Sequence, residues 1–178
     1  MLGGGQLGRM TALAGRAMGY RIHVLDPDPA CSASPVADRC VTARFDDVDA
    51  ARDMARHCDV VTMEIEQIAP AVLDAARAYA PTRPDSAAVA VIQDRARQKH
   101  WLHEHGFPVG PFLTVDSATH VRQALADFGD AFVKSARGGF DGRSQVRATL
   151  KSDANEVWAA LGQKSGVAER ALDLVAEL

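Results

Sequence analysis

The 178-residue sequence has little that would indicate a metal-binding, nucleic-acid-binding or membrane protein. Its three cysteines have neither C-x-x-C spacing nor paired histidines, so we expect reduced thiols and no zinc site. The formal net charge of -3 offers no basic surface for nucleic acid. No apolar run approaches the roughly 18 to 20 residues that cross a bilayer, and no basic segment leads into an apolar stretch at the N-terminus. We therefore expect a cytoplasmic protein without a nucleic-acid or membrane partner.

The composition is that of a folded globular protein. Hydrophobic residues make up 47% and charged residues 24%, and this length suits one ordinary domain or two small ones. Over residues 1–85 strand and helix patterns alternate, which predicts an α/β domain with a parallel sheet of Rossmann type. We expect helices over 9–19, 46–58 and 69–80, and strands over 20–28, 39–45 and 59–68. The first helix would have Met10, Leu13, Ala14, Ala17 and Met18 on one face.

Residues 86–178 have a different order of strand and helix patterns, and they form a second predicted domain, a small α+β lobe. Its strands at 131–137 and 145–150 flank the glycine-rich turn "GGFDGRS". We expect helices over 88–106, 117–129 and 152–163, an extended segment over 107–115 and a last strand over 166–172, with Ser117 as a helix cap.

The opening "GGGQLGRM" has two interpretations. Gly3, Gly5 and Gly8 fit the G-x-G-x-x-G turn of dinucleotide sites, and Asp26 follows near the place where an acid would hold a ribose. Glycines at such a turn are also needed for tight strand-to-helix packing without any ligand. Glu64 and Glu66 stand at a strand end, where open sheets bind ligands, and are either substrate-binding carboxylates or an exposed pair.

The stretch "VKSARGGFDGRSQ" contains the most residues suited to binding a ligand. Lys134 ends a strand just before Gly138, Gly139 and Gly142, whose amides could fold over phosphates, although a simple β-hairpin also explains the glycines. Upstream, Arg95 and Lys99 share a helix face at i, i+4, where like charges repel mildly unless an anion lies nearby. The clustered residues His100, His103 and His105 have no metal-ligand spacing and read as surface residues of a helix.

Six motifs, in this order, resemble one family: "GGGQLGRM", "LDPDPACSASPVAD", "VVTMEIEQI", "QDRARQK", "GFPVGPF" and "VKSARGGFDGRSQ". The chain is similar to the carboxyaminoimidazole ribonucleotide synthetases, ATP-grasp enzymes of purine biosynthesis. The resemblance implies a Rossmann-like first domain that binds the ribonucleotide, followed by part of an ATP-grasp domain. It also implies an ATP-dependent ligase, in which ATP converts bicarbonate to carboxyphosphate and the carboxyl group passes to the amine of aminoimidazole ribonucleotide.

The resemblance also implies which residues bind each substrate. The ribonucleotide would meet Gly5, Gln6, Leu7 and Glu64, and the catalytic roles would fall to Asp141 and Arg143. ATP would be bound by Arg95 and Lys134, by the loop residues Gly139, Phe140, Asp141, Gly142, Arg143, Ser144 and Gln145, by the adenine-hinge residues Glu169, Arg170, Ala171 and Leu172, and by Glu177 at the ribose.

The sequence departs from the family at two loop positions. Phe140 stands where tyrosine is usual, so a hydroxyl is missing, and Ser144 replaces a common glycine, which restricts loop closure. The family also continues beyond the position of Leu178 with the part that carries its magnesium ligands, and it forms homodimers. We therefore expect a fragment or truncated form of such an enzyme, with no metal ligand of its own. An NAD-dependent oxidoreductase, a non-catalytic nucleotide-binding module and a carboxylase of another small amine stay open as alternatives.

Overall fold

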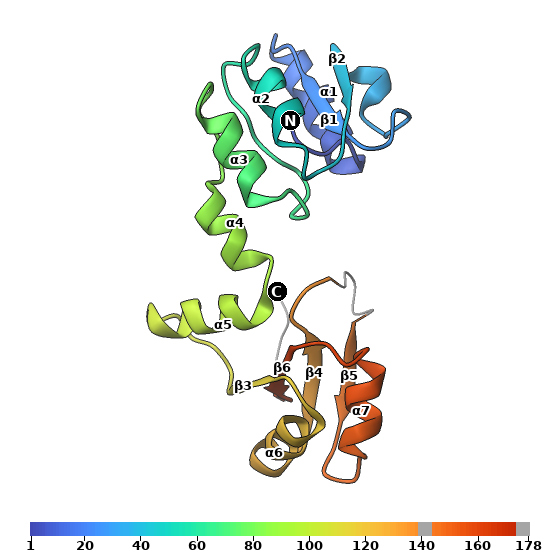
Figure 1. The fold of residues 1–178 in the computed structure, drawn as a ribbon, viewed down its shortest axis with the longest axis vertical. Coiled ribbons are helices and arrows are strands. Elements are labelled where there is room, and N and C mark those ends of the chain that lie inside the picture. Colours follow the sequence, from blue (N-terminus) through green and yellow to red (C-terminus); the bar gives the residue numbers. More distant parts are fainter. Residues whose placement is uncertain (139–143, 174–178) are drawn as a thin grey trace. The chain divides into compact units, whose positions relative to one another are not determined.

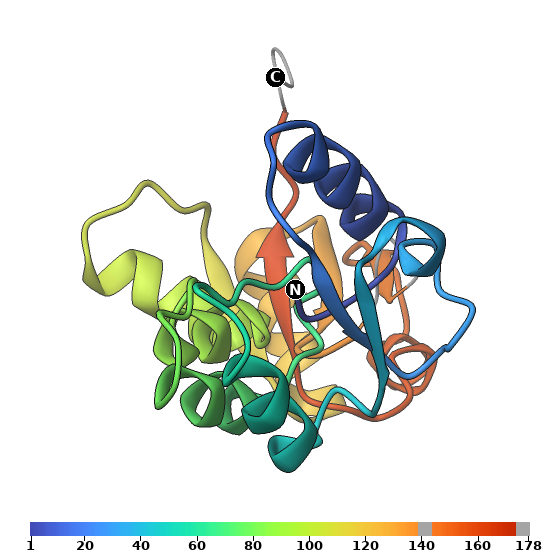
Figure 2. The ribbon, with the colours of Figure 1, turned by 90° about the horizontal axis from the view of Figure 1, so that it is seen from above.

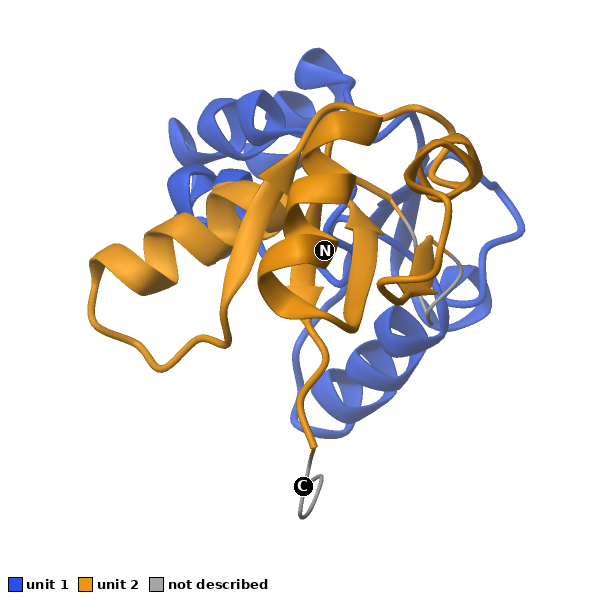
Figure 3. Ribbon diagram, turned by 90° about the horizontal axis from the view of Figure 1, so that it is seen from below, with its two compact units in different colours: residues 1–90 blue, residues 91–178 orange. Residues whose placement is uncertain are grey.

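A computed structural model describes residues 1–138 and 144–173. The chain divides into two compact units, Met1–Ala90 and Val91–Leu178, drawn in two colours in Figure 3. The domain boundary expected at residue 85 from the sequence stays a prediction. Each unit has its own sheet and its own hydrophobic core.

The first unit is built around short parallel strand segments. β1 (His23–Asp26) pairs in parallel with β2 (Arg39–Thr42), and parallel bridges join Leu2 to Leu25 and to Met63. A further parallel bridge joins Val61 to Thr82. The predicted strand over 59–68 is thus reduced to isolated bridges. The helical elements are α1 (Gln6–Ala17), η1 (Ser34–Val36), α2 (Val48–Ala55) and α3 (Pro70–Arg77), and α4 (Ser86–Ile92) crosses the unit boundary.

Alternation along β1 places its two central side chains in different apolar clusters. Leu25 packs with residues of α2 and α3 such as Met54 and Leu73, whereas Val24 packs with Met1 and Cys31. In Figure 2, α1 lies on one side of the two strands and the α2–α3 pair on the other. The strands are therefore covered by helices on both faces, which matches the predicted α/β layering.

The apolar face predicted for α1 is exposed. Met10, Leu13 and Met18 are 59%, 48% and 73% exposed, and Ala14 and Ala17 are exposed as well. The helix buries Gly8 and Ala12 instead. A Cβ at Gly8 would lie 3.1 Å from the Gly3 carbonyl oxygen, so small residues allow the close approach of helix and turn. Side-chain size, rather than hydrophobicity, decides which face packs.

The second unit has a four-stranded antiparallel sheet in the order β3-β6-β4-β5. Val115, Val133 and Ala168 lie on one face of it, in a core cluster that also contains residues of α6 and α7. Figure 1 shows these two helices beside the sheet. Side chains at the alternate positions, including Lys134 and Glu169, occupy the other face. The elements are α5 (Arg95–Glu104), β3 (Phe112–Val115), α6 (Ala118–Phe128), β4 (Ala131–Ser135), β5 (Gln145–Ala148), α7 (Ala154–Ala160) and β6 (Gly166–Arg170).

Helix capping sets the helix boundaries in this part of the chain. The single helix predicted over 88–106 is two helices, α4 and α5, because the Asp94 carboxylate accepts the N–H groups of Ala96 and Arg97 and so starts a new helix. The predicted cap at Ser117 is confirmed, since its hydroxyl accepts the His120 N–H at 3.3 Å.

Because Leu25 is buried and Met18 is exposed, their substitutions should differ in their effect on the stability of the first unit. Leu25→Ala should lower the free energy of unfolding by about 2 to 5 kcal/mol, because it leaves a cavity in a fully buried cluster. Met18→Ala should change it by less than about 0.5 kcal/mol. Urea denaturation followed by circular dichroism measures both variants. Equal losses would contradict the assignment of α1's outer face to solvent.

Candidate functional site

Two carboxylates fix the glycine turn at the carboxyl end of the first unit's strands. Gly4 N–H donates to Asp26 Oδ2 at 2.8 Å, and Gly5 N–H donates to Glu64 Oε1 at 2.8 Å. Gly5 is the N-cap of α1, and Gln6 and Leu7 are exposed in its first turn. The four residues predicted to meet the ribonucleotide, Gly5, Gln6, Leu7 and Glu64, therefore lie at one edge of the strands.

Close packing explains the glycines of this turn. A Cβ at Gly4 would lie 2.5 Å from Cys31 Sγ and 2.8 Å from Val24 Cγ1, and Gly3 has a φ of +94°. The N–H groups of Gly4 and Gly5 are already bonded to the chain's own carboxylates. A phosphate would have to compete with these acceptors, so the geometry favours the packing interpretation over a dinucleotide site.

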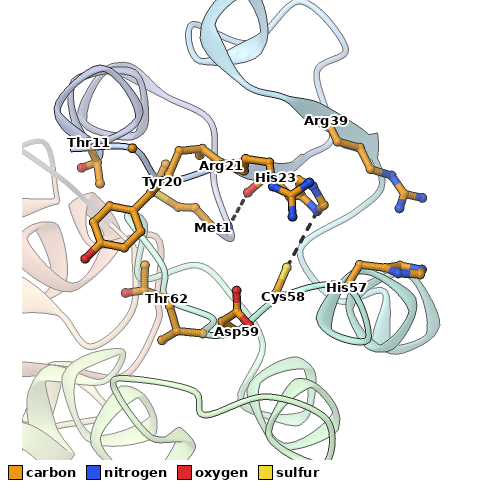
Figure 4. A pocket seen from close by; sticks show the side chains of 13 residues that line it. Met1, Thr11, Tyr20, Arg21, His23, Arg39, His57, Cys58, Asp59 and Thr62 are labelled. Atoms are coloured by element: carbon orange, nitrogen blue, oxygen red, sulfur yellow. Dashed lines mark hydrogen bonds between the residues drawn. The ribbon is translucent and has the colours of Figure 1, made fainter. Parts of the chain in front are cut away.

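A cavity of about 670 Å³ lies at the opposite, amino end of the same strands (Figure 4). Met1, His23, Arg39 and Cys58 are among its lining residues, and none of the residues predicted to bind a ligand lines it. Burial, followed by the nearby positive charge of Arg39, lowers the pKa of His23 below its usual value. Burial also lowers the pKa of the Met1 amino group and raises the pKa of the Cys58 thiol. Burial at the cavity wall therefore favours the uncharged forms of these three groups.

Three charged side chains meet on the open face of the second unit's sheet. Lys134 Nζ on β4 lies 3.2 Å from Glu169 Oε2 on β6, and Lys99 Nζ on α5 lies 3.1 Å from the same oxygen. All three side chains are only 20–25% exposed. The register places Lys134 opposite Gln145 of β5 and Val167 of β6. The strand pairing therefore brings Lys134, Gln145 and Glu169 to one surface.

Arg95 joins α5 to the segment that follows β4. Its Nη1 donates to the carbonyl oxygens of Ser135 and Gly138, each at 3.0 Å, and its backbone N–H donates to the Ala136 oxygen at 2.8 Å. Ser135 N–H in turn donates to the Ser144 oxygen at 3.0 Å. Arg95 and Ser144 therefore lie at the two ends of the glycine-rich loop, beside Lys134.

The predicted hinge residues leave the sheet at the end of β6. The N–H of Arg170 donates to the Pro111 oxygen at 3.0 Å, and the N–H of Ala171 donates to the Asp130 oxygen at 2.9 Å. Leu172 follows with its side chain 53% exposed. The remaining predicted residues, Gly139, Phe140, Asp141, Gly142, Arg143 and Glu177, lie outside the described residues.

Comparison with known families decides what kind of protein carries this arrangement. Residues 1–93 match the family model of the ribonucleotide synthetase preATP-grasp domain. The chain belongs to this family. Residues 100–178 match the ATP-grasp domain, so the preATP-grasp unit precedes ATP-grasp sequence in one chain. The fold is thus of the ATP-grasp type, with mixed α/β structure, and the resemblance drawn from the sequence motifs is confirmed.

Two relatives of this preATP-grasp chain have the same name. It is 33% identical over 179 residues to the N5-carboxyaminoimidazole ribonucleotide synthase of Staphylococcus aureus strain COL, covering 100% of the chain and 48% of the relative. It is 36% identical over 172 residues to the enzyme of the same name from Brucella melitensis, covering 95% of the chain and 48% of the relative. The chain therefore spans about half the length of the curated relatives it matches.

Solved structures agree with these relatives. The structure of N5-carboxyaminoimidazole synthetase from Staphylococcus aureus with ADP matches with a TM-score of 0.90 at 33% identity, covering 97% of this chain and 46% of that one. The structure of N5-carboxyaminoimidazole synthase from Aspergillus clavatus with ADP and 5-aminoimidazole ribonucleotide matches with a TM-score of 0.81 at 29% identity, covering 96% and 45%.

Sequence reasoning missed one member of the charged cluster on the ATP-grasp unit. The sequence marks Lys99 only as a like charge near Arg95, although their i, i+4 spacing on one helix face is itself the signal. The prediction that His100 is a surface residue is confirmed, since it is exposed, with its Nε2 3.1 Å from Thr114 Oγ1. Within the described ranges, no group of three or more His, Cys, Asp or Glu side chains is placed to hold a metal ion. The helices of this same portion include none that could span a membrane.

The bond between Asp26 and the glycine turn predicts that this carboxylate stabilises the preATP-grasp unit. Asp26→Ala should lower the free energy of unfolding by about 1 to 3 kcal/mol, because the partly buried Gly4 N–H loses its acceptor. Asp26→Asn keeps one side-chain oxygen and should cost less. Urea denaturation compares them, and an Asp26→Ala variant as stable as the parent would contradict this role.

The lowered pKa of His23 predicts a loss of stability in mild acid. The unfolded chain takes up the proton first, near pH 6.5, so the free energy of unfolding should fall as the pH drops below about 6.5, until the lower pKa of the folded state is reached. His23→Gln should remove this part of the pH dependence, whereas the exposed His57→Gln should keep it. Urea denaturation at pH values between about 7.5 and 5.5 tests this, and identical slopes in all three proteins would refute it.

Proposed function

We propose that the protein to which this chain belongs carboxylates 5-aminoimidazole ribonucleotide to carboxyaminoimidazole ribonucleotide, with ATP and bicarbonate as the other substrates. The observation that carries the proposal is the cluster of Lys134, Gln145 and Glu169 on the open face of an ATP-grasp sheet. Support comes from the relatives of that name and from the similar structure whose ligands are ADP and 5-aminoimidazole ribonucleotide.

In this proposal the second unit binds ATP. Lys134 carries a compact charge suited to a phosphate, and Arg95 holds the segment that leads into the loop that would cover it. The remaining nucleotide contacts are proposed from the family resemblance alone. They are Gly139, Phe140, Asp141, Gly142, Arg143, Ser144 and Gln145 over the phosphates, Glu169, Arg170, Ala171 and Leu172 at the adenine, and Glu177 at the ribose.

The first unit would bind the ribonucleotide at the edge that carries Gly5, Gln6, Leu7 and Glu64. We infer a Rossmann-like arrangement for this unit, supported by the parallel pairing of β1 with β2 and the parallel bridges at Leu2 and Val61. Glu64 holds the Gly5 N–H through Oε1, so its other oxygen is the one suited to a substrate hydroxyl or amine.

Charge neutralisation and positioning, rather than a protein nucleophile, would perform the chemistry. ATP supplies the phosphoryl group that activates bicarbonate, and Lys134 and Arg95 supply positive charge beside it. Asp141 and Arg143 are proposed as the catalytic residues, on the resemblance alone. The family's ATP is accompanied by Mg²⁺, but the described part of this chain has no cluster to hold the ion, and we assign it no step. A cytoplasmic homodimer is proposed on the same family grounds.

Calorimetric titration with Mg-ATP and, separately, with NADH tests the proposal. Mg-ATP should bind, and Lys134→Ala should weaken it by about tenfold or more, because one charge-assisted contact to phosphate is lost. The exposed Lys151→Ala is the matched control and should bind as the parent does. An assay of aminoimidazole ribonucleotide carboxylation then separates an active enzyme from a nucleotide-binding module without turnover.

Two results would overturn the proposal. NADH binding that is insensitive to Lys134→Ala but lost in Asp26→Arg would favour the oxidoreductase alternative. The absence of binding to either nucleotide would show that this chain carries no nucleotide site.

A further inference from the structure

Glu169 has two cationic partners. Lys99 and Lys134 approach the same oxygen, Oε2, at 3.1 and 3.2 Å, from a helix and from a neighbouring strand. Among residues 1–138 and 144–173, Glu169 is the one carboxylate within 4.0 Å of either ammonium group. The single negative charge of Glu169 is therefore paired with two positive charges, and the cluster has a net charge of about +1.

This net positive charge is held where solvent screens it weakly. The three side chains are 20–25% exposed, and two like charges brought to one acceptor in such a place repel one another more than they would in water. Each ammonium has three N–H donors, and Glu169 Oε2 is one anionic partner shared by both. The cluster is thus suited to a further ligand with negative charge and several acceptor oxygens.

The position of Lys99 on α5 places it beside the other cations of this unit. Arg95 lies one helical turn before it and bonds the carbonyl oxygens of Ser135 and Gly138, directly after the strand that carries Lys134. The i, i+4 pair of like charges on α5 is mildly unfavourable in a helix without an anion. Arg95, Lys99 and Lys134 therefore border one region at the start of the glycine-rich loop.

We propose that Lys99 is a phosphate-binding residue of the nucleotide site, and that Glu169 serves as an internal counter-ion that holds Lys99 and Lys134 in place until phosphate oxygens replace it. This inference rests on the proposed function, because it assigns Lys99 to the site that binds ATP. It also gives Glu169 a role toward the phosphates, in addition to the adenine-side role implied by the family.

The test compares three probes, Mg-ATP, inorganic tripolyphosphate and adenosine, by calorimetry or by NMR titration at low salt. Lys99→Gln should weaken Mg-ATP and tripolyphosphate by about tenfold and leave adenosine unchanged, since only the phosphates meet the lysine. Lys99→Arg, which keeps the charge, should retain most of the affinity. Lys164→Gln, at an exposed position, is the matched control and should behave as the parent chain.

Glu169→Gln provides a second, independent variant. It removes the competing negative charge but keeps a side-chain oxygen as a neutral acceptor for the lysines, so tripolyphosphate should bind about tenfold more tightly than to the parent. A merely structural ion pair would lower the melting temperature in this variant without tightening the binding of phosphate. This readout stands even if Lys99→Gln fails to fold.

The outcomes separate the two proposals. If the parent binds Mg-ATP and Lys99→Gln binds it equally well, Lys99 is not a phosphate-binding residue and the proposed function stands. If Glu169→Gln binds tripolyphosphate no more tightly than the parent, the counter-ion role is refuted. If the parent binds neither Mg-ATP nor tripolyphosphate, both the proposed nucleotide site and the proposed role of Lys99 are refuted.

Discussion

In both units, half-buried carboxylates bind donor groups of the chain itself and so fix the glycine turn of the first unit and the lysines of the second. In the first unit, Asp26 and Glu64 accept the N–H groups of consecutive glycines and so tie two strand ends to the start of α1. Without these acceptors, two partly buried amides would be left without partners at the point where the helix begins. The glycines allow this close approach, because a side chain at Gly4 would collide with Cys31 and Val24. The candidate substrate edge therefore depends on the carboxylates for its shape.

The second unit uses a carboxylate differently, to gather cations rather than amides. Glu169 joins α5 to β4 through two lysines, on the sheet face opposite the core formed with α6 and α7. Burial of the apolar face fixes the strand register, and the register then decides which polar residues meet on the other face. A shift of β4 by one residue would move Lys134 toward the core and separate it from Glu169. Stability and site geometry are thus set by the same pairing.

Sequence patterns predicted the alternation of elements and the region of the candidate site, but not its side-chain partners. Periodicity and capping residues located most helices and strands, because these signals are local. The buried face of α1 could not be predicted from hydrophobicity, which marks Met10 and Leu13, whereas close contact with the turn requires Gly8 and Ala12. The pairing of Lys99 with Glu169 joins residues that are distant in sequence. It depends on how α5 packs beside β6, and periodicity along one segment carries no information about that.

Strand β6 physically connects the two halves of the proposed nucleotide site. Its last residue, Arg170, and the following Ala171 are held through their backbone, since they donate to Pro111 and Asp130, while the Glu169 side chain is held by the two lysines. Exchanging the carboxylate for phosphate oxygens would free that side chain and leave the backbone where it is. The segment proposed to receive the adenine would therefore keep its position while the charge beside it changes. In such an arrangement the internal ion pairs preserve the placement of the lysines. The unfavourable free energy of bringing two like charges together is then compensated when the protein folds, and not when the ligand binds.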